Sequence, residues 1–204
     1  EIYLGGRAIT AHEGTGALRY HPRCYYRPDE HSPTEIWPAM IASVTDLAGR
    51  QTGAHRTWLS PDGSGKAPVE TPRRAMGDLL GHGVRFGVSG EVLAAGEGIE
   101  TVLSPRQVLP RMPMLAALSA AHLAAILFPA TLRRLYVLRD RDPAGDGARD
   151  SLIARAESVG IEAIAVSPVG EDFNDDLRWR GVDALRATLM DQLRPEDISR
   201  FMEG

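Results

Sequence analysis

The sequence predicts an α/β fold built on a sheet of parallel strands, preceded by a smaller α+β region. From about Val88 onward, short apolar runs alternate with helical patterns, which is typical of parallel strand–helix units. Residues 1–87 contain strand patterns separated by turns rich in Gly and Pro, which favour an antiparallel meander. The chain has 204 residues, of which 43% are hydrophobic, so it is long enough to bury a core. We expect three parts: an N-terminal subdomain at 1–87, the parallel-sheet domain at 88–190, and a C-terminal tail with a short helix at 191–204.

In the N-terminal subdomain, a helix is expected to end at the turn Gly5–Gly6. Two strands are expected, at residues 35–49 and 55–66. The turn SPDGSG ends at Lys66 and resembles a phosphate-binding loop at first sight. The Walker pattern fails, however, because Ser60 and Ala67 stand where Gly and Ser or Thr are required.

The parallel-sheet domain is expected to alternate strands and helices in chain order. The strands are expected at residues 91–97, 114–119, 132–140 and 162–168. The helices are expected at residues 99–109, with an interruption near Pro105, and at 120–129, 144–160 and 174–193. Ser119 and Gly160 are placed to cap the second and third helices, and Pro195 to begin a last short helix.

Composition excludes several classes of protein. No apolar run reaches the roughly 18 residues needed to span a bilayer, and the N-terminus lacks the features of a signal peptide, so we expect a cytoplasmic protein without membrane contact. The single cysteine, Cys24, excludes an internal disulfide and a zinc ribbon with paired cysteines, and we expect it to be buried. Because the first residue is Glu1, we expect the chain to be a piece of a longer protein.

The formal net charge of −4 argues weakly against a nucleic-acid binder. Residues 1–86 carry ten Lys or Arg against nine acids, while the remainder carries thirteen against eighteen. The N-terminal subdomain can therefore supply cations to a polyanion, although the chain as a whole is acidic.

Acidic residues follow three of the expected strands, where reactive groups of parallel sheets collect. They are Glu97, the pair Asp140 and Asp142, and the pair Asp172 and Asp175. Asp140 and Asp142 lie two residues apart on an extended chain, so both side chains point the same way. At about 4 Å, two such charges repel by roughly 4 kcal/mol at an effective dielectric near 20. A hard divalent cation, Mg²⁺ or Mn²⁺, would offset this repulsion; alternatively, Asp142 could simply cap the next helix.

The motifs GEGIET, RDRDPAG and GEDFND resemble, in this order, those of the Toprim domain of bacterial DNA primases, topoisomerases and some nucleases. The resemblance covers roughly residues 91–189 and implies a Rossmann-like Toprim fold. The DxDxAG form is that of primases. The upstream stretches YLGGRAI, HRTWLSPDGSGKA and GHGVRFG resemble the N-terminal half of a DnaG-type primase core, especially in phage and mobile-element proteins.

The resemblance implies a role for each acid. Glu97 is similar to the family's general base or metal-positioning glutamate, and Asp140 and Asp142 to its metal ligands. Asp172 matches the additional acid of the third motif, with Asp175 as a further candidate in a motif one residue longer than usual. Many primases have Asp where this chain has Thr101, so one ligand is missing or is replaced by Glu100.

Cations are needed for a triphosphate and for template phosphates. The candidates in the primase-like segments are Arg7, Arg56 and Lys66, followed by Arg73, Arg74 and Arg85. The N–H groups around Gly145, at the start of a helix, are expected to be free for a phosphate.

The resemblance implies metal-dependent nucleotidyl transfer, with Mg²⁺ or Mn²⁺ held by the acids, that makes short primers on single-stranded DNA. Nucleoside triphosphates and a single-stranded DNA template are the expected partners, together with a helicase or another replication module. Two alternatives stay open: a Toprim nuclease, and a non-catalytic nucleic-acid-binding module with a degenerate site. A topoisomerase would need a catalytic tyrosine, for which the sequence offers no clear candidate.

Overall fold

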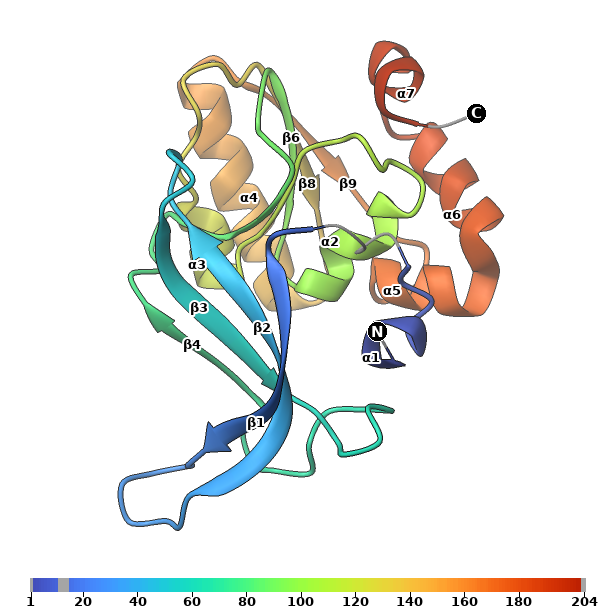
Figure 1. Cartoon of the computed structure of the whole chain (residues 1–204). Coiled ribbons are helices and arrows are strands. Elements are labelled where there is room, and N and C mark those ends of the chain that lie inside the picture. The colour runs from blue at the N-terminus through green and yellow to red at the C-terminus, as the bar shows by residue number, and fades with distance from the viewer. Residues whose placement is uncertain (1, 11–14, 203–204) are drawn as a thin grey trace.

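The computed structural model describes residues 2–10 and 15–202, and these form two sheets with helices packed mainly around the second (Figure 1). The first sheet is an antiparallel meander of four strands in the order β1-β2-β3-β4. Its strands are β1 (Leu18–Tyr26), β2 (Glu35–Thr45), β3 (Gln51–Trp58) and β4 (Arg73–Gly77). The predicted meander is confirmed, and the hairpin of β1 and β2 projects away from the second sheet.

The sequence analysis did not predict the two edge strands of this sheet, β1 and β4. Most residues of β1 and β4 are exposed, so neither strand shows an apolar face. Pro22 also lies inside β1, where the pairing register shifts between His21 and Cys24. A proline is tolerated at such an irregular edge because no ladder hydrogen bond depends on its nitrogen. Cys24 is half-buried rather than fully buried.

The second sheet has five strands in the order β5-β7-β6-β8-β9. They are β5 (Val84–Phe86), β6 (Val92–Gly96), β7 (Met114–Ala116), β8 (Arg134–Leu138) and β9 (Glu162–Val166). All neighbouring pairs are parallel except β5 with β7. The predicted α/β class with a parallel sheet behind an N-terminal α+β region is therefore confirmed. Strand β5 precedes the boundary that we predicted at residue 87, and that boundary stays a prediction.

Helices follow the strands in the predicted order. They are α1 (Ile2–Gly5), α2 (Ile99–Arg106), α3 (Ala120–Ala125), α4 (Pro143–Ser158), α5 (Phe173–Asp175), α6 (Gly181–Met190) and α7 (Pro195–Phe201). Ser119 caps α3 as expected, because its side chain accepts a hydrogen bond from the His122 amide. Pro105 lies inside α2, which ends one residue later.

The helix predicted at 174–193 is broken into three pieces. Helix α5 is followed by a π-helix at Asp176–Arg180 and then by α6. Gly181 has a φ of 84°, which favours glycine, and the chain changes direction there. The predicted strand at 55–66 likewise ends at Trp58, and the rest is a loop.

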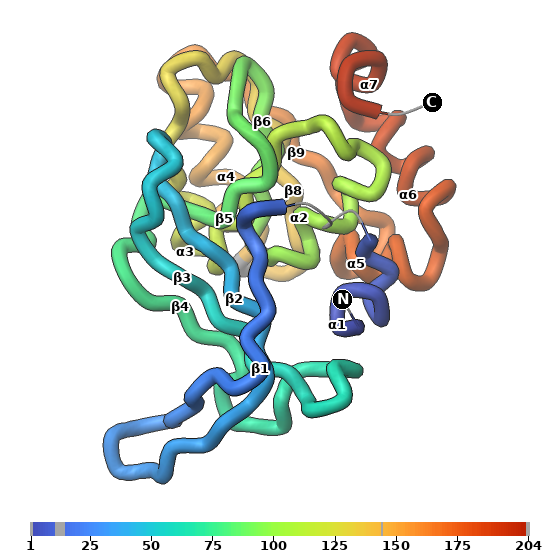
Figure 2. The backbone as a smooth tube through the Cα atoms, viewed as in Figure 1, coloured from blue at the N-terminus to red at the C-terminus, as the bar shows by residue number. Residues whose placement is uncertain are grey.

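Two cores lie on the two faces of the second sheet, because alternate strand residues point to opposite faces. One core joins the sheet to α3 and α4 through Leu93, Leu135, Val137, Leu123, Leu152 and Ala156. The other joins it to α2, to α6 and to the first sheet through Ala94, Tyr136, Val102, Leu185, Met40 and Val44. The first sheet is thereby fixed against the second. Figure 2 shows α1 beside α5, although the two helices lie far apart in the sequence.

Helix α7 is fixed by a buried acid. The Asp197 carboxylate accepts hydrogen bonds of 2.7 Å from Arg134 Nη1 and from the Tyr136 hydroxyl. Arg134 also contacts Glu162 and Glu196. No helix of the described residues is long and apolar enough to cross a bilayer.

Candidate active site

Glu97 lies directly after β6, at the carboxyl end of a central strand, and Gly98 caps α2 behind it. The preceding Gly96 is required for packing: a Cβ there would lie 3.0 Å from Val102 Cγ2 and 3.3 Å from Leu138 Cβ. The close approach of α2 to β8 therefore explains this glycine without a ligand.

Asp140 and Asp142 follow β8, the neighbour of β6 in the sheet. Oδ1 of Asp140 accepts a 3.0 Å hydrogen bond from the Thr101 hydroxyl. Oδ1 of Asp142 accepts a 2.7 Å hydrogen bond from the Gly145 amide and so caps α4. The capping alternative is therefore correct for Asp142, and the Gly145 N–H that we expected to be free is used within the chain. For each aspartate, the second oxygen makes no hydrogen bond with a described residue.

Asp172 follows β9 in the chain and caps α5, because its Oδ1 accepts a 2.7 Å hydrogen bond from the Asp175 amide. Asp176, which the sequence analysis passed over, is 1% exposed and accepts hydrogen bonds from the amides of Val169 (2.7 Å) and Gly170 (2.8 Å). Asp176 therefore holds the loop that positions Asp172. The four acids of GEDFNDD could not be assigned to these roles from the sequence.

The acids of the three strand ends influence one another. The pKa of Asp140 is raised to about 6, chiefly by burial; the Thr101 hydrogen bond opposes this rise, and the charges of Glu97, Asp172 and Asp142 add to it. Burial and then the charge of Asp142 also raise the pKa of Glu97. In the described part of the protein, no arginine or lysine lies at salt-bridge distance from Asp140, Asp142 or Asp172. Their negative charge is therefore largely uncompensated.

The chemistry of these donors fits a hard divalent cation, because all of them are carboxylate oxygens. Among residues 2–10 and 15–202, no three His, Cys, Asp or Glu side chains converge closely enough to form a metal-binding group. An all-protein cage such as a structural zinc site is not present in the described chain.

Glu100 does not replace the acid missing at Thr101. Its carboxylate accepts a 2.5 Å hydrogen bond from the Tyr3 hydroxyl and lies 3.9 Å from Nε of Arg7. Burial alone would raise the pKa of Glu100, yet the Tyr3 hydrogen bond and the charges of Lys66 and Arg7 hold it below its usual value. Glu100 therefore faces the cations of the N-terminal subdomain, while Thr101 faces Asp140.

Four residues, Arg7, His55, Lys66 and Arg73, form a group that we call the basic cluster. Burial lowers the pKa of Lys66, as do the charges of Arg73 and Arg7, while Glu100 opposes them. Burial also lowers the pKa of His55 to about 4, again with help from Arg73. The charge of Arg73 also opposes the rise in the pKa of Glu97. The basic cluster therefore borders the acidic strand ends, and Lys66 is the only lysine in the sequence.

Strand pairing explains which predicted cations face the acids. Arg73 is opposite Thr57 on β3, so it shares a face with His55. Arg56 is opposite Arg74, and this pair points to the other face. Arg74 is held there by hydrogen bonds of 2.7 Å to the carbonyls of Arg27 and Pro28, and Arg56 lies over the Trp58 ring at 4.9 Å. Arg56 and Arg74 are therefore separated from the acids by the sheet.

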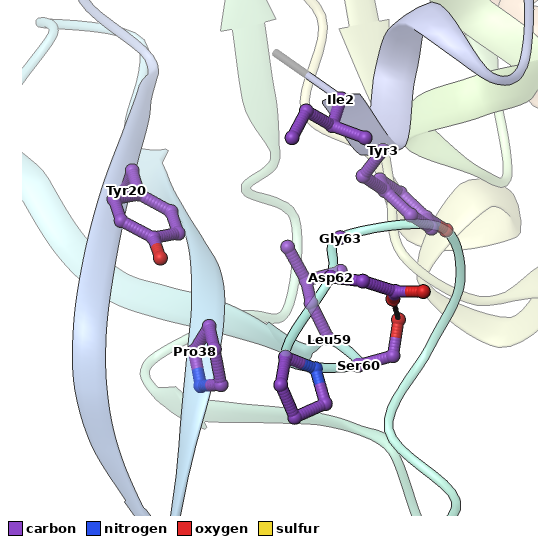
Figure 3. A pocket seen from close by; sticks show the side chains of 9 residues that line it. Ile2, Tyr3, Tyr20, Pro38, Leu59, Ser60, Asp62 and Gly63 are labelled. Carbon is purple, nitrogen blue, oxygen red and sulfur yellow. Dashed lines mark hydrogen bonds between the residues drawn. The ribbon is translucent and has the colours of Figure 1, made fainter.

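The loop before Lys66 is tied together by Asp62 rather than left open for a phosphate. Its Oδ1 accepts hydrogen bonds from the Ser60 hydroxyl (2.6 Å), the Ser64 amide (3.0 Å) and the Ser64 hydroxyl (2.9 Å). Figure 3 shows this loop as one wall of a largely apolar pocket of about 340 Å³, with Tyr3 and Tyr20 among the other walls. Because Tyr3 also contacts Glu100 and Arg7, the pocket borders the basic cluster.

Comparisons with known proteins agree with this geometry. Residues 92–183 match the family described as "Toprim domain", and residues 1–86 match a "Domain of unknown function (DUF7146)". A DNA primase domain from Pseudomonas aeruginosa is similar in structure at 16% identity and a TM-score of 0.63, over 93% of this chain and 70% of that one.

Two further solved structures show the same likeness. The zinc-binding and RNA polymerase domains of the Aquifex aeolicus primase match at 18% identity and a TM-score of 0.57, over 83% of this chain and 44% of that one. The RNA polymerase domain of Mycobacterium tuberculosis primase DnaG, in complex with a double-stranded DNA oligomer with a 6-nucleotide overhang, matches at 17% identity and 0.57, over 94% and 72%. The chain thus spans less than half of the Aquifex chain. Residues 92–183 therefore match the Toprim domain, and the chain has a fold similar to that of the solved primases.

Proposed function

We propose that the chain is the catalytic core of a DNA primase and joins nucleotides into short primers on single-stranded DNA. One observation carries the proposal: uncompensated acids at three strand ends lie beside the basic cluster. Nucleotidyl transfer needs this combination, because the reacting phosphoryl group is held by cations on both sides. The similarity to solved primases supports the proposal through the fold alone.

The acids Glu97, Asp140, Asp142 and Asp172 are the residues that would hold Mg²⁺ or Mn²⁺. Such an ion would lower the charge on the phosphoryl oxygens and on the attacking 3′-hydroxyl. Asp142 and Asp172 are fixed in one rotamer by their capping hydrogen bonds, so each presents its second oxygen without further loss of side-chain freedom. Asp175 stays a candidate ligand.

The basic cluster would bind and orient the triphosphate. Lys66, Arg73 and Arg7 repel one another, which is costly unless an anion lies among them. A triphosphate supplies that anion next to the acids. Glu97, whose pKa burial raises, would accept a proton from the 3′-hydroxyl.

The other face of the first sheet would contact the template. Arg56 and Arg74 line a hollow of about 430 Å³ there, together with Tyr25, Arg27 and Trp58. Tyr25 is 69% exposed, so its ring is available to stack on a base. Arginines beside exposed aromatic rings are typical of surfaces that bind single strands.

The test is primer synthesis from labelled triphosphates on single-stranded DNA with Mg²⁺ or Mn²⁺. We expect short products from the wild type, none from Asp140→Asn, and unchanged products from Asp183→Asn, an exposed aspartate on α6. Lys66→Ala should lose synthesis, whereas Lys66→Arg should keep part of it. Absence of products from the wild type under all conditions would contradict the proposal.

Lys66 allows a second, independent measurement. As the only lysine, it can be labelled by an amine-reactive reagent and identified by peptide mass. Because its pKa is lowered, it should react faster than an ordinary lysine at the same pH. Protection by a nucleoside triphosphate, but not by a nucleoside, would support triphosphate binding at the basic cluster.

A second candidate function, a non-catalytic nucleic-acid-binding module, is favoured by Thr101. This residue stands where many primases carry an acid, and its hydroxyl occupies one oxygen of Asp140. Divalent-cation binding that depends on Asp140, together with DNA binding but no turnover, would support this candidate. Hydrolysis of DNA that is independent of Lys66 would support a Toprim nuclease.

A further inference from the structure

Two arginines outside the acids and the basic cluster lie near the edge strand of the second sheet. That strand is β5, where Arg85 is paired with Leu115 of β7. Next to β5 lies a cavity of about 690 Å³ that Arg85 and Arg106 line. These two arginines are the only charged residues among the described residues of its wall.

Arg85 is half-buried, and no described residue forms a salt bridge with it. Its Nε and Nη2 atoms are inaccessible to solvent and have no hydrogen-bond partner in the described parts of the chain. Burial lowers the pKa of Arg85, and the charge of Asp46 only partly opposes this. A buried guanidinium with unused N–H groups is costly unless an anion pairs with it.

Asp46 is already committed to another residue. Its carboxylate accepts hydrogen bonds from the Arg50 side chain at 2.8 and 2.9 Å, and from the amides of Ala48 and Arg50. It therefore balances Arg50, and within the described structure it makes no salt bridge with Arg85.

Arg106 is the last residue of α2, and the chain holds its guanidinium in place. Its Nη1 donates hydrogen bonds to the carbonyls of Phe86 (3.3 Å) and Met112 (3.0 Å). Burial lowers the pKa of Arg106 as well. Hydroxyl and amide side chains complete the polar wall, from Thr15, Ser43, Thr45 and Gln51.

We propose that this cavity binds a phosphate group through Arg85 and Arg106. The exposed part of the Arg85 guanidinium and the Arg106 guanidinium can each donate to phosphate oxygens, and hydroxyl and amide groups can donate to the remaining oxygens. Two sources share this chemistry: a phosphodiester of a nucleic-acid strand and a free phosphorylated molecule. The site does not depend on the proposed primase activity, because its described wall contains neither the acids nor the residues of the basic cluster.

The first experiment titrates inorganic pyrophosphate into the protein by calorimetry in buffer with a chelator. Lys66→Ala removes binding at the basic cluster, so this background isolates the cavity. We expect binding in Lys66→Ala to weaken at least tenfold when Arg85→Met is added, and not to change with Arg111→Met, an exposed arginine. Equal binding with and without Arg85 would overturn the proposal.

Thermal unfolding provides a readout that does not rely on calorimetry. Pyrophosphate should raise the Tm of Lys66→Ala and not that of the double variant, because a ligand stabilises only the protein that binds it. If Arg85→Met does not fold, Arg85→Lys replaces it: the charge stays but the fork is lost, and binding should still weaken about tenfold. Full binding by Arg85→Lys would contradict the role of the guanidinium.

The second experiment separates the two sources with a single-stranded oligodeoxynucleotide. If a DNA phosphodiester occupies the cavity, Arg85→Met should weaken DNA binding and reduce the slope of log K against log salt concentration by about one. If a free phosphorylated molecule is the ligand, DNA binding should be unchanged while pyrophosphate binding is lost. Loss of neither would overturn the proposal.

Discussion

The hydroxyl of Thr101, on α2, donates a 3.0 Å hydrogen bond to Oδ1 of Asp140, which follows β8. The residue at the position of a missing acid thus contacts the central aspartate of the site. A neutral donor there favours the ionised form of Asp140, whereas a second carboxylate would oppose it. Thr101 therefore makes the site less negative than a carboxylate at this position would, and it keeps a polar contact with Asp140.

Removal of this hydroxyl should raise the pKa of Asp140 further. Burial raises the pKa of Asp140, and this hydrogen bond partly offsets the rise. Hydrogen bonds to charged groups contribute about 1.5–3 kcal/mol. In Thr101→Val, we expect Asp140 to titrate about one pH unit or more above the wild type. The carboxyl-carbon NMR shift of Asp140 measures this directly. Thr131→Val, which removes an exposed hydroxyl elsewhere, should leave the titration unchanged.

Asp140→Asn should stabilise the metal-free protein at neutral pH. The folded pKa of Asp140, about 6, is above its ordinary value of 3.8, so ionisation opposes folding increasingly as the pH rises from 4 to 6. Asn avoids this cost. We expect the variant to gain about 2–3 kcal/mol over the wild type at pH 7 and almost nothing at pH 3.5. Urea unfolding at both pH values tests this, and equal gains at both would contradict it.

His55 should give the opposite pH dependence. Its folded pKa, about 4, is below its ordinary value of 6.5, so the wild type loses stability as the pH falls from 6.5 to 4. His55→Gln removes this loss. Relative to the wild type, the variant should therefore improve by about 2–3 kcal/mol between pH 7 and pH 4. Because the Asp140 and His55 effects largely cancel over this range, only the single variants should reveal them. His31→Gln, at an exposed histidine, is the control.

Gly145 and Gly147, both in α4, should respond oppositely to alanine. A Cβ on Gly145 would lie 2.7 Å from the Asp140 carbonyl oxygen, whereas a Cβ on Gly147 would meet nothing within 4 Å. We expect Gly145→Ala to cost about 1–3 kcal/mol and to weaken divalent-cation binding, because the Asp140–Asp142 turn must shift. Gly147→Ala should stabilise the helix by about 0.5–1 kcal/mol. Similar effects in both variants would show that the contact is unimportant.

Asp197 and Glu196 offer a matched pair on α7. Both contact Arg134, but Asp197 is 2% exposed and also binds the Tyr136 hydroxyl, whereas the Glu196 side chain is 61% exposed. Asp197→Ala should cost about 3–5 kcal/mol, because it leaves buried donors without a partner. Glu196→Ala should cost less than about 1 kcal/mol. Denaturant unfolding of the two variants checks the difference.

The fold class and the order of the second half followed from local sequence. Alternating apolar runs, a capping Ser119 and the left-handed Gly160 depend only on neighbours in the chain, so they were recognisable. The exposed edge strands β1 and β4 have no such pattern, and the π-helix at 176–180 departs from ordinary helical periodicity. These elements depend on partners far away in the sequence.

For the candidate site, the sequence by itself determined which acids follow which strands, because strand ends and carboxylates are both visible in a linear pattern. Only the tertiary structure decided that Glu100 faces Arg7 while Thr101 faces Asp140, and that Arg73 faces the acids while Arg56 and Arg74 lie across the sheet. It also placed Arg85 on the edge strand of the second sheet. The physical reason is that charge acts through space: the pKa of a group depends on burial and on neighbours within a few ångströms, and these come from segments that the chain order does not bring together.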